Sequence, residues 1–265
     1  MVQVFLDHVF VCAVFCLNMN PVMTTLTFVG ECLILLGDAG RRLFKRPFEF
    51  GELMQQISFV GVASIPIVAL TTFFSGSVLA LYSTEILIRY GAGSLGGGTV
   101  ALAVTREIAP VLAGIMVAAR CGSAMAAQIG SMNVTEQVDA LRALNVSPTN
   151  YLTIPRILAT IIALPILCLI GCYSGIIGGM IVSEIGGIPQ VSFMNSLRQF
   201  IQPWDIVGGM IKAFVFGLIV ATVACQQGYR CTEGAVGVGR ATTQSVVISM
   251  VLIYAANFIL AGLMY

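Results

Sequence analysis

The chain has 265 residues, of which 58% are hydrophobic and only 9% are charged, with 13 Lys and Arg against 12 Asp and Glu. A soluble domain carries about 25% charged residues, so this composition excludes an ordinary water-soluble globule and indicates an integral membrane protein. The net charge of +1 excludes the strongly basic surface that nucleic-acid binding requires. With a single histidine and no GxxxxGK[ST] phosphate loop, we expect no metal site, no cofactor and no catalytic residue.

The N-terminal part of the chain is predicted to lie outside the membrane-spanning domain. Residues 1–23 are interpreted as a leader, which differs from a cleaved signal peptide because Asp7 and His8 interrupt its apolar stretch. Residues 24–48 mix apolar side chains with acidic residues and a basic cluster at positions 41–46. This mixture favours an amphipathic helix that lies in the cytoplasmic membrane interface, with a further membrane span as the alternative.

Five segments of the remaining domain, residues 49–265, are predicted to cross the membrane, since a crossing helix needs about 20 mainly apolar residues. They are residues 57–81, 100–128, 157–182, 206–225 and 246–264. With the N-terminus in the cytoplasm, nine Lys and Arg side chains lie inside and two outside, which obeys the positive-inside bias. Five glycines between positions 91 and 98 predict a pliable loop or a plain turn before the second span.

The second span, residues 100–128, carries charges that the other spans mostly lack. Only twelve uncharged residues separate Glu107 from Arg120, about 18 Å of helix against a hydrocarbon core of about 30 Å. A re-entrant segment is the alternative to a complete crossing. Small residues at every fourth position favour a complete helix that packs closely against its neighbours. They are Gly114, Ala118, Gly122, Ala126 and Gly130.

The segment that follows, residues 131–148, is predicted to form a short amphipathic helix on the cytoplasmic side. Its apolar residues recur at near-helical spacing, while Pro148 stops the pattern and Asn145 is a suitable end residue. The plain interpretation is a connector that rests on lipid. The alternative is a rigid element that a cytoplasmic motor can push.

Three stretches of the chain resemble the MlaE family, the permease subunits of lipid-transporting ABC systems that work with MCE-domain proteins. The first stretch is residues 105–130, and a third, shorter one is residues 239–243. Between them lies an E-Q-x-x-A-L…P…P-R pattern, carried by Glu136, Gln137, Ala140, Leu141, Pro148, Pro155 and Arg156. The resemblance extends from about residue 24 to the C-terminus.

The resemblance implies an all-α integral membrane protein with an N-terminal interfacial helix, five transmembrane helices and a short cytoplasmic coupling helix. It also implies a multi-pass homodimer in the inner membrane, with ABC ATPase subunits beneath it and an MCE-domain hexamer on the other face. Phospholipid would pass through a cavity at the dimer interface, and the partner would hydrolyse ATP, so this subunit is not itself an enzyme. The residues implied to couple to the ATPase are Glu136, Gln137, Ala140, Leu141, Arg142 and Leu144.

Charged side chains inside the predicted spans mark a candidate substrate site. An ionisable group at mid-bilayer costs about 2.5–3.5 kcal/mol on insertion scales, so it usually faces a cavity or forms a pair. Glu107 and Lys212 each lie about two turns from the outer ends of their spans. We expect them, with Arg106, to line the outer part of the lipid cavity and to pair or meet a lipid phosphate. A purely structural ion pair is the alternative.

The rest of the cavity wall is expected to be apolar, as acyl chains require. The candidate wall residues are Leu70, Phe74, Val78 and Val111. Two other function classes stay open. One is an ion-coupled secondary transporter of an amphipathic substrate that uses Glu107 as a proton relay, although five spans do not divide into equal halves. The other is a passive membrane anchor for an extracytoplasmic assembly.

Overall fold

The computed structural model describes residues 21–42 and 50–264. Every regular element in these two ranges is a helix, which confirms the prediction of an all-α membrane fold. The chain divides into two compact units, Met1–Lys45 and Arg46–Tyr265, which are described separately.

The first unit contains helix α2 (Pro21–Arg42). The helix therefore includes residues 21–23, which the sequence assigned to the leader, whereas residues 1–20 and 43–48 of the predicted segments lie outside the described residues. Arg41 and Arg42 occupy its last turn, where cations complement the helix dipole, and Arg42 Nε lies 2.6 Å from Asp38 Oδ1.

Several apolar side chains of α2 are more than half exposed, namely Leu26, Val29, Leu33 and Ile34. Such a helix, with exposed apolar residues and terminal cations, has the composition of an interfacial helix. Its position in the membrane interface stays a prediction.

The second unit contains five helical segments that are long and apolar enough to span a membrane, as the sequence predicted. The first segment consists of α3 (Phe50–Val60), η2 (Val62–Ser64) and α4 (Ile65–Arg89). The second consists of η3 (Gly93–Leu95), α5 (Gly96–Ala103), η4 (Val104–Ile108), α6 (Ala109–Val117), η5 (Ala118–Gly122) and α7 (Ser123–Val134). The others are η6 (Thr149–Thr153) with α9 (Ile154–Ile185), then α11 (Pro203–Tyr229) and α12 (Gly234–Met264).

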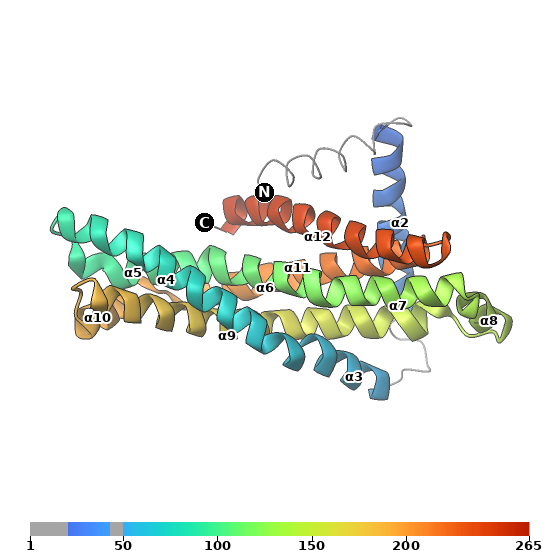
Figure 1. Cartoon of the computed structure of the whole chain (residues 1–265), viewed down its shortest axis with the longest axis horizontal. Coiled ribbons are helices and arrows are strands. Elements are labelled where there is room, and N and C mark those ends of the chain that lie inside the picture. Colours follow the sequence, from blue (N-terminus) through green and yellow to red (C-terminus); the bar gives the residue numbers. More distant parts are fainter. Residues whose placement is uncertain (1–20, 43–49, 265) are drawn as a thin grey trace. The chain divides into compact units, whose positions relative to one another are not determined.

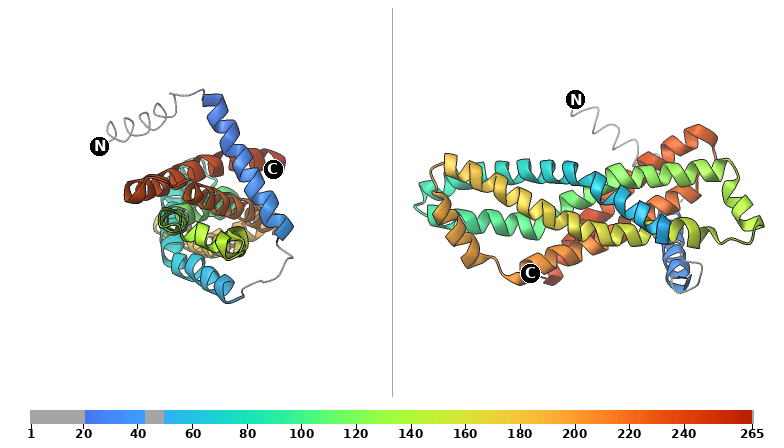
Figure 2. Two further views of the ribbon diagram at one scale, coloured as in Figure 1. Left: turned by 90° about the vertical axis from the view of Figure 1, so that its right-hand side faces the viewer. Right: turned by 90° about the horizontal axis from the view of Figure 1, so that it is seen from below.

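Two shorter helices lie at opposite ends of this unit, α8 (Gln137–Ala143) at one end and α10 (Gln190–Phe200) at the other (Figures 1 and 2). The spans run lengthwise between them, α4 beside α9 and α11 beside both α7 and α12. Each helical segment is longer than the predicted crossing, because the helix continues into polar residues beyond the apolar stretch.

Close backbone contact between α4 and α9 depends on glycine. A Cβ atom on Gly76 would overlap the backbone carbonyl of Gly175, and one on Gly178 would overlap the carbonyl of Phe73. The Ser174 hydroxyl donates to the carbonyl of Ala69 at 2.7 Å across the same interface. Small residues at a helix interface allow this approach where lipid supplies no hydrophobic driving force between helices.

The ridge of small residues in the second span packs closely against neighbouring helices, as predicted. A Cβ on Gly114 would meet Phe216 and Ile253 at 3.3 Å, and one on Gly122 would meet Val220 at 3.3 Å. These contacts place the ridge against α11 and α12. The second span is therefore a complete helical crossing in length, not a short re-entrant segment.

The glycine-rich stretch before the second span forms the predicted turn only at its start, where Gly91 has a φ of 70°. Gly96, Gly97 and Gly98 are buried and form the first turn of α5. A Cβ on Gly97 would overlap the backbone of Phe193 in α10, and the Gly98 N–H donates to the Ser196 hydroxyl at 2.9 Å. These glycines therefore serve close packing of α5 on α10, which local sequence does not reveal.

The short helix α8 is fixed at both ends by residues in the left-handed region. Glu136 precedes the helix with a φ of 58°, and Asn145 follows it with a φ of 59°. The N–H of Val146 donates to the Leu141 carbonyl at 2.9 Å and that of Asn145 to the Arg142 carbonyl at 3.0 Å. This pair of bonds is a Schellman motif, which confirms Asn145 as the end residue.

Candidate functional site

The second span departs from α-helical geometry where its charges lie. The π-helical segment η4 contains Arg106 and Glu107, and a second π-helical segment, η5, contains Arg120. A π segment leaves backbone groups free to bond elsewhere and is frequent at functional sites. Here the Arg106 carbonyl accepts a hydrogen bond from Lys212 Nζ at 2.9 Å, so the irregular turn receives a partner from α11.

The expected pairing of Glu107 with Lys212 is present in the structure. Lys212 Nζ lies 2.7 Å from Glu107 Oε1, and the two residues come from spans 105 positions apart in sequence. The Lys212 side chain is fully buried, whereas 42% of the Glu107 side chain is exposed. Glu107 is therefore the accessible member of the pair, and the buried Lys212 fixes the position of its carboxylate through the ion pair.

Glu107 has another partner, which the sequence argument missed. Asn257 of α12 donates through Nδ2 to Glu107 Oε2 at 2.6 Å. The carboxylate thus connects η4, α11 and α12 through its two oxygens. The available signal was an amide in an otherwise apolar span, because polar groups within a membrane span usually have a partner.

Arg106 has an acidic partner that was also missed. Its Nε and Nη2 atoms each lie 2.8 Å from Asp205 Oδ1, and the Asp205 side chain is 2% exposed. Asp205 Oδ2 accepts from the backbone N–H of Gln202 at 2.9 Å in a capping box at the start of α11. The capping pattern was visible in the sequence, but the pairing with Arg106 depends on how the two spans pack.

The two ion pairs are alike in how their members are buried. In each, one partner is buried (Lys212 and Asp205) and the other is partly exposed, Glu107 by 42% and Arg106 by 37%. The two partly exposed side chains are a carboxylate and a guanidinium on consecutive residues of η4. A guanidinium forms strong charge-assisted hydrogen bonds to a phosphate, so the expectation that these residues meet a lipid headgroup stays a prediction.

The apolar wall candidates separate into two groups. Leu70, Phe74 and Val78 repeat every fourth residue on α4 and are 58%, 57% and 55% exposed, so they form an apolar stripe. Val111 is only 8% exposed and packs in the core of the protomer. The structure thus argues against Val111 as a wall residue, and we leave it out of the proposed surface.

The residues proposed to couple to an ATPase lie on an exposed helix. Val138 anchors α8 and is fully buried. Leu141 is half-buried, and Leu144 is 74% exposed. The other predicted coupling residues are exposed, namely Glu136, Gln137, Ala140 and Arg142. Arg142 Nη1 pairs with Asp139 Oδ1 at 2.8 Å, so the exposed face carries a local ion pair beside an apolar residue.

These features together define a class of protein. A bundle of five membrane-spanning segments, two of them joined by ion pairs, is a multi-pass integral membrane protein with a candidate functional site inside the membrane. Residues 53–263 match the family described as "Permease MlaE". The chain belongs to the MlaE permease family.

Individual relatives have similar lengths or longer chains. A "Probable ABC transporter permease protein" of Rickettsia bellii is 43% identical over 89% of this chain and 92% of its own. The "Intermembrane phospholipid transport system permease protein MlaE" of Haemophilus influenzae is 34% identical over 82% of this chain and 84% of its own. "Protein TRIGALACTOSYLDIACYLGLYCEROL 1, chloroplastic" of Arabidopsis thaliana is 38% identical over 88% of this chain and 67% of its own.

Proposed function

We propose that the chain is the permease subunit of an ABC transporter that moves phospholipids between the inner membrane and an MCE-protein partner. ATP is hydrolysed by a separate ATPase subunit, so the permease itself carries out no chemical step. The names of the Rickettsia and Haemophilus relatives support an ABC system and a phospholipid cargo. The observation that carries the proposal is the pair of partly exposed charges, Arg106 and Glu107, within a membrane span.

These charges support a homodimer with a polar cavity. Lipid chains solvate neither a guanidinium nor a carboxylate, so charged side chains in a span face a cavity or another protein surface. The second protomer of a homodimer supplies such a surface and encloses the cavity between the two copies. In this arrangement Arg106 contacts the lipid phosphate, and Glu107 contacts a cationic headgroup or a hydroxyl.

The acyl chains of the substrate need a different surface. The stripe of Leu70, Phe74 and Val78 on α4 provides exposed apolar side chains for them. Helix α4 contacts η4, so the stripe and the charges belong to neighbouring elements. An amphipathic lipid thus finds both a charged and an apolar surface on one protomer.

The exposed helix α8 is the proposed contact for the ATPase. Its Schellman end and its buried Val138 hold it as a rigid element joined to α7. We place the α8 end and the N-terminus in the cytoplasm, in agreement with the positive-inside bias. The MCE-domain hexamer then binds at the opposite end, where α10 lies.

The test is lipid transfer by the complex purified with its native partners and reconstituted in proteoliposomes. Lys212→Ala and Glu107→Gln are expected to reduce ATP-dependent transfer of a fluorescent phospholipid, while the complex still assembles. Arg89→Ala removes a cation that is 73% exposed in its side chain and serves as the matched control with unchanged transfer. Transfer that persists in both site variants would contradict the proposal.

The same preparation separates the alternatives. Uptake by the chain alone, driven by a pH gradient, would support a secondary transporter. Leu141→Asp places a charge on α8 and is expected to abolish coupling to ATP hydrolysis. Transfer that is unaffected by Leu141→Asp would instead favour a passive anchor.

A further inference from the structure

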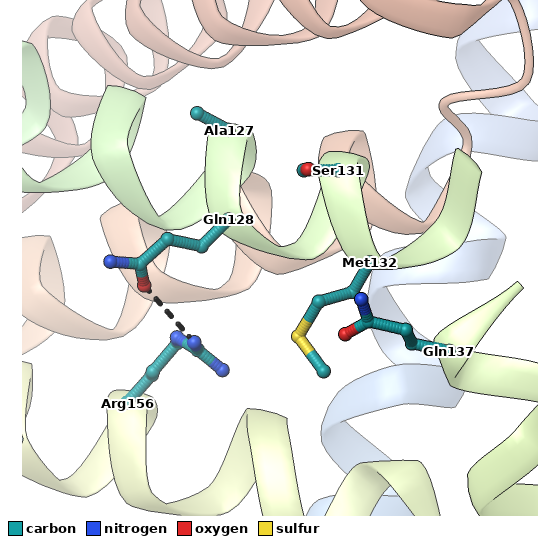
Figure 3. Close-up of a pocket in the computed structure, with 6 residues that line it drawn as sticks. All are labelled: Ala127, Gln128, Ser131, Met132, Gln137 and Arg156. Atoms are coloured by element: carbon teal, nitrogen blue, oxygen red, sulfur yellow. Dashed lines mark hydrogen bonds between the residues drawn. The ribbon is translucent and has the colours of Figure 1, made fainter. Parts of the chain in front are cut away.

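A pocket of about 500 Å³ lies near the α8 end of the second unit, between α7, α9 and the start of α8 (Figure 3). It is lined by Ala127, Gln128, Ser131, Met132, Gln137 and Arg156. Four of these side chains are polar: one guanidinium, two amides and one hydroxyl. None of the lining residues carries a carboxylate, so the lining has a net positive charge.

Arg156 is the charged group of this pocket, and it is 5% exposed. Its Nη1 donates to the Leu152 carbonyl at 2.8 Å, and its Nη2 donates to Gln128 Oε1 at 3.1 Å. Its Nε has no hydrogen-bond partner among the described residues, and no ion pair joins Arg156 to any acidic side chain of that part of the chain.

This arrangement leaves a buried positive charge without a counter-ion. A guanidinium is always protonated in proteins and has five N–H donors, of which the bonds to Leu152 and Gln128 use one each. Buried charges are normally paired, because removing an ion from water is costly. Within the described ranges, Lys212 is the one other basic residue that is at most 5% exposed, and it has an acidic partner, Glu107. Arg156 is the exception.

The depth of the pocket indicates which anion is available. The predicted apolar crossings end at residue 128 and begin again at residue 157, so Gln128 and Arg156 lie at the edge of the hydrocarbon region. Lipid phosphate groups lie just beyond this edge. The pocket is remote from the ion pairs of η4, since Arg106 and Gln128 are separated by about 33 Å along the helix.

We propose that this pocket binds a phosphate group, with Arg156 as the charged donor. Gln128 accepts from Arg156 through Oε1, which leaves its amide NH₂ as a donor, and Gln137 and Ser131 add further donors around the pocket (Figure 3). The phosphate belongs to a lipid in the leaflet at the α8 end or to a soluble phosphate compound. Because Gln137 is the first residue of α8, an occupied pocket contacts the helix proposed to bind the ATPase.

The proposal does not rest on lipid transport, and binding to the purified full-length chain tests it directly. The chain in maltoside micelles is titrated calorimetrically with dihexanoyl phosphatidic acid, with inorganic phosphate and with dihexanoylglycerol, which lacks the phosphate. Binding of phosphatidic acid alone identifies a lipid headgroup, and binding of inorganic phosphate identifies a soluble source. Failure of both phosphate probes to bind overturns the proposal.

Two variants assign the binding to this pocket. Arg156→Gln removes the charge, and Ser131→Phe fills the pocket while leaving the hydrogen bonds of Arg156 in place. Arg156→Gln is expected to weaken phosphate binding at least about tenfold, as loss of a charge-assisted bond does. Ser131→Phe is expected to weaken it at least as much, because the added ring occupies the space of the phosphate. Arg240→Gln is the matched control, because it removes a cation that is 63% exposed in its side chain and pairs with Glu233.

The second variant keeps the test decisive if Arg156→Gln fails to fold. The thermal midpoint of Ser131→Phe without ligand is expected to equal that of the unmodified chain, since the substitution lies at an exposed position. Unchanged phosphate binding in folded Ser131→Phe would overturn the assignment of the phosphate to this pocket.

Discussion

The Lys212–Glu107 pair provides a test of the site energetics, because its two side chains are unequally buried. Glu107→Gln leaves Lys212 fully buried and replaces its carboxylate partner by a neutral amide, while the Arg106 carbonyl still accepts from it. Lys212→Met instead leaves the Glu107 carboxylate without its lysine partner, but this side chain is 42% exposed and keeps its hydrogen bond from Asn257. The same ion pair is lost in both variants, but only the first leaves a buried charge behind.

The magnitudes follow from this asymmetry. Removing one partner and leaving a buried charge uncompensated costs about 3–5 kcal/mol. The Glu107→Gln variant is expected near the lower end, about 3 kcal/mol, because the Arg106 carbonyl still accepts from Lys212. Lys212→Met is expected to cost about 1–2 kcal/mol, because the remaining carboxylate is partly exposed and still hydrogen-bonded.

The assay is the free energy of unfolding of the purified chain in mixed detergent micelles, measured by denaturant titration. The double variant Glu107→Gln/Lys212→Met is expected to be close to Lys212→Met alone, since it leaves no uncompensated charge. A Lys212→Met variant that is less stable than Glu107→Gln, or additive losses in the double variant, would refute the reasoning.

Three further predictions concern the fold around the site. Gly76→Ala is expected to separate α4 from α9 and to cost at least about 2 kcal/mol in unfolding free energy, because its Cβ would overlap the Gly175 carbonyl. Gly239→Ala, which meets nothing within 4 Å, is the control, and equal losses would contradict the packing argument. Asn145→Val is expected to cost about 1–2 kcal/mol, because a β-branched residue fits poorly at a φ of 59°, whereas Asn145→Gly is tolerated in the same measurement. Asp205→Asn removes the charge that faces Arg106 but keeps the capping oxygen; lower transport is expected with a modest loss of about 1–2 kcal/mol, because Arg106 is partly exposed, and a much larger loss would indicate a structural role.

Composition and the spacing of charges were sufficient to predict several features. Hydrophobic length placed four of the spans, because a helix in lipid must bury its backbone polar groups within itself, and the ridge of small residues favoured the second span as the fifth. The pairing of Glu107 with Lys212 was predictable because two opposite charges at one depth in apolar spans have few other partners. Asn145 was predictable as a helix end because the left-handed conformation there depends on local sequence.

Packing between distant segments determined the remaining features. Asp205 and Asn257 join the site only because α11 and α12 lie against the second span. The glycines at 96–98 form a helical turn rather than a loop because the backbone of α10 packs directly on them. The sequence shows an amide in an apolar span and a capping pattern before α11, but it does not show which distant groups these residues contact.

The burial of Val111 could not be inferred from the apolar composition of the second span. The residue follows the π-helical segment η4, and each extra residue in a π turn rotates the following side chains by about 100° relative to an unbroken α-helix. The apolar composition of the second span therefore established that it crosses the membrane. Which of its side chains face the protein interior depended on where the helix widens, and that was decided by the hydrogen bonds and packing of the folded chain.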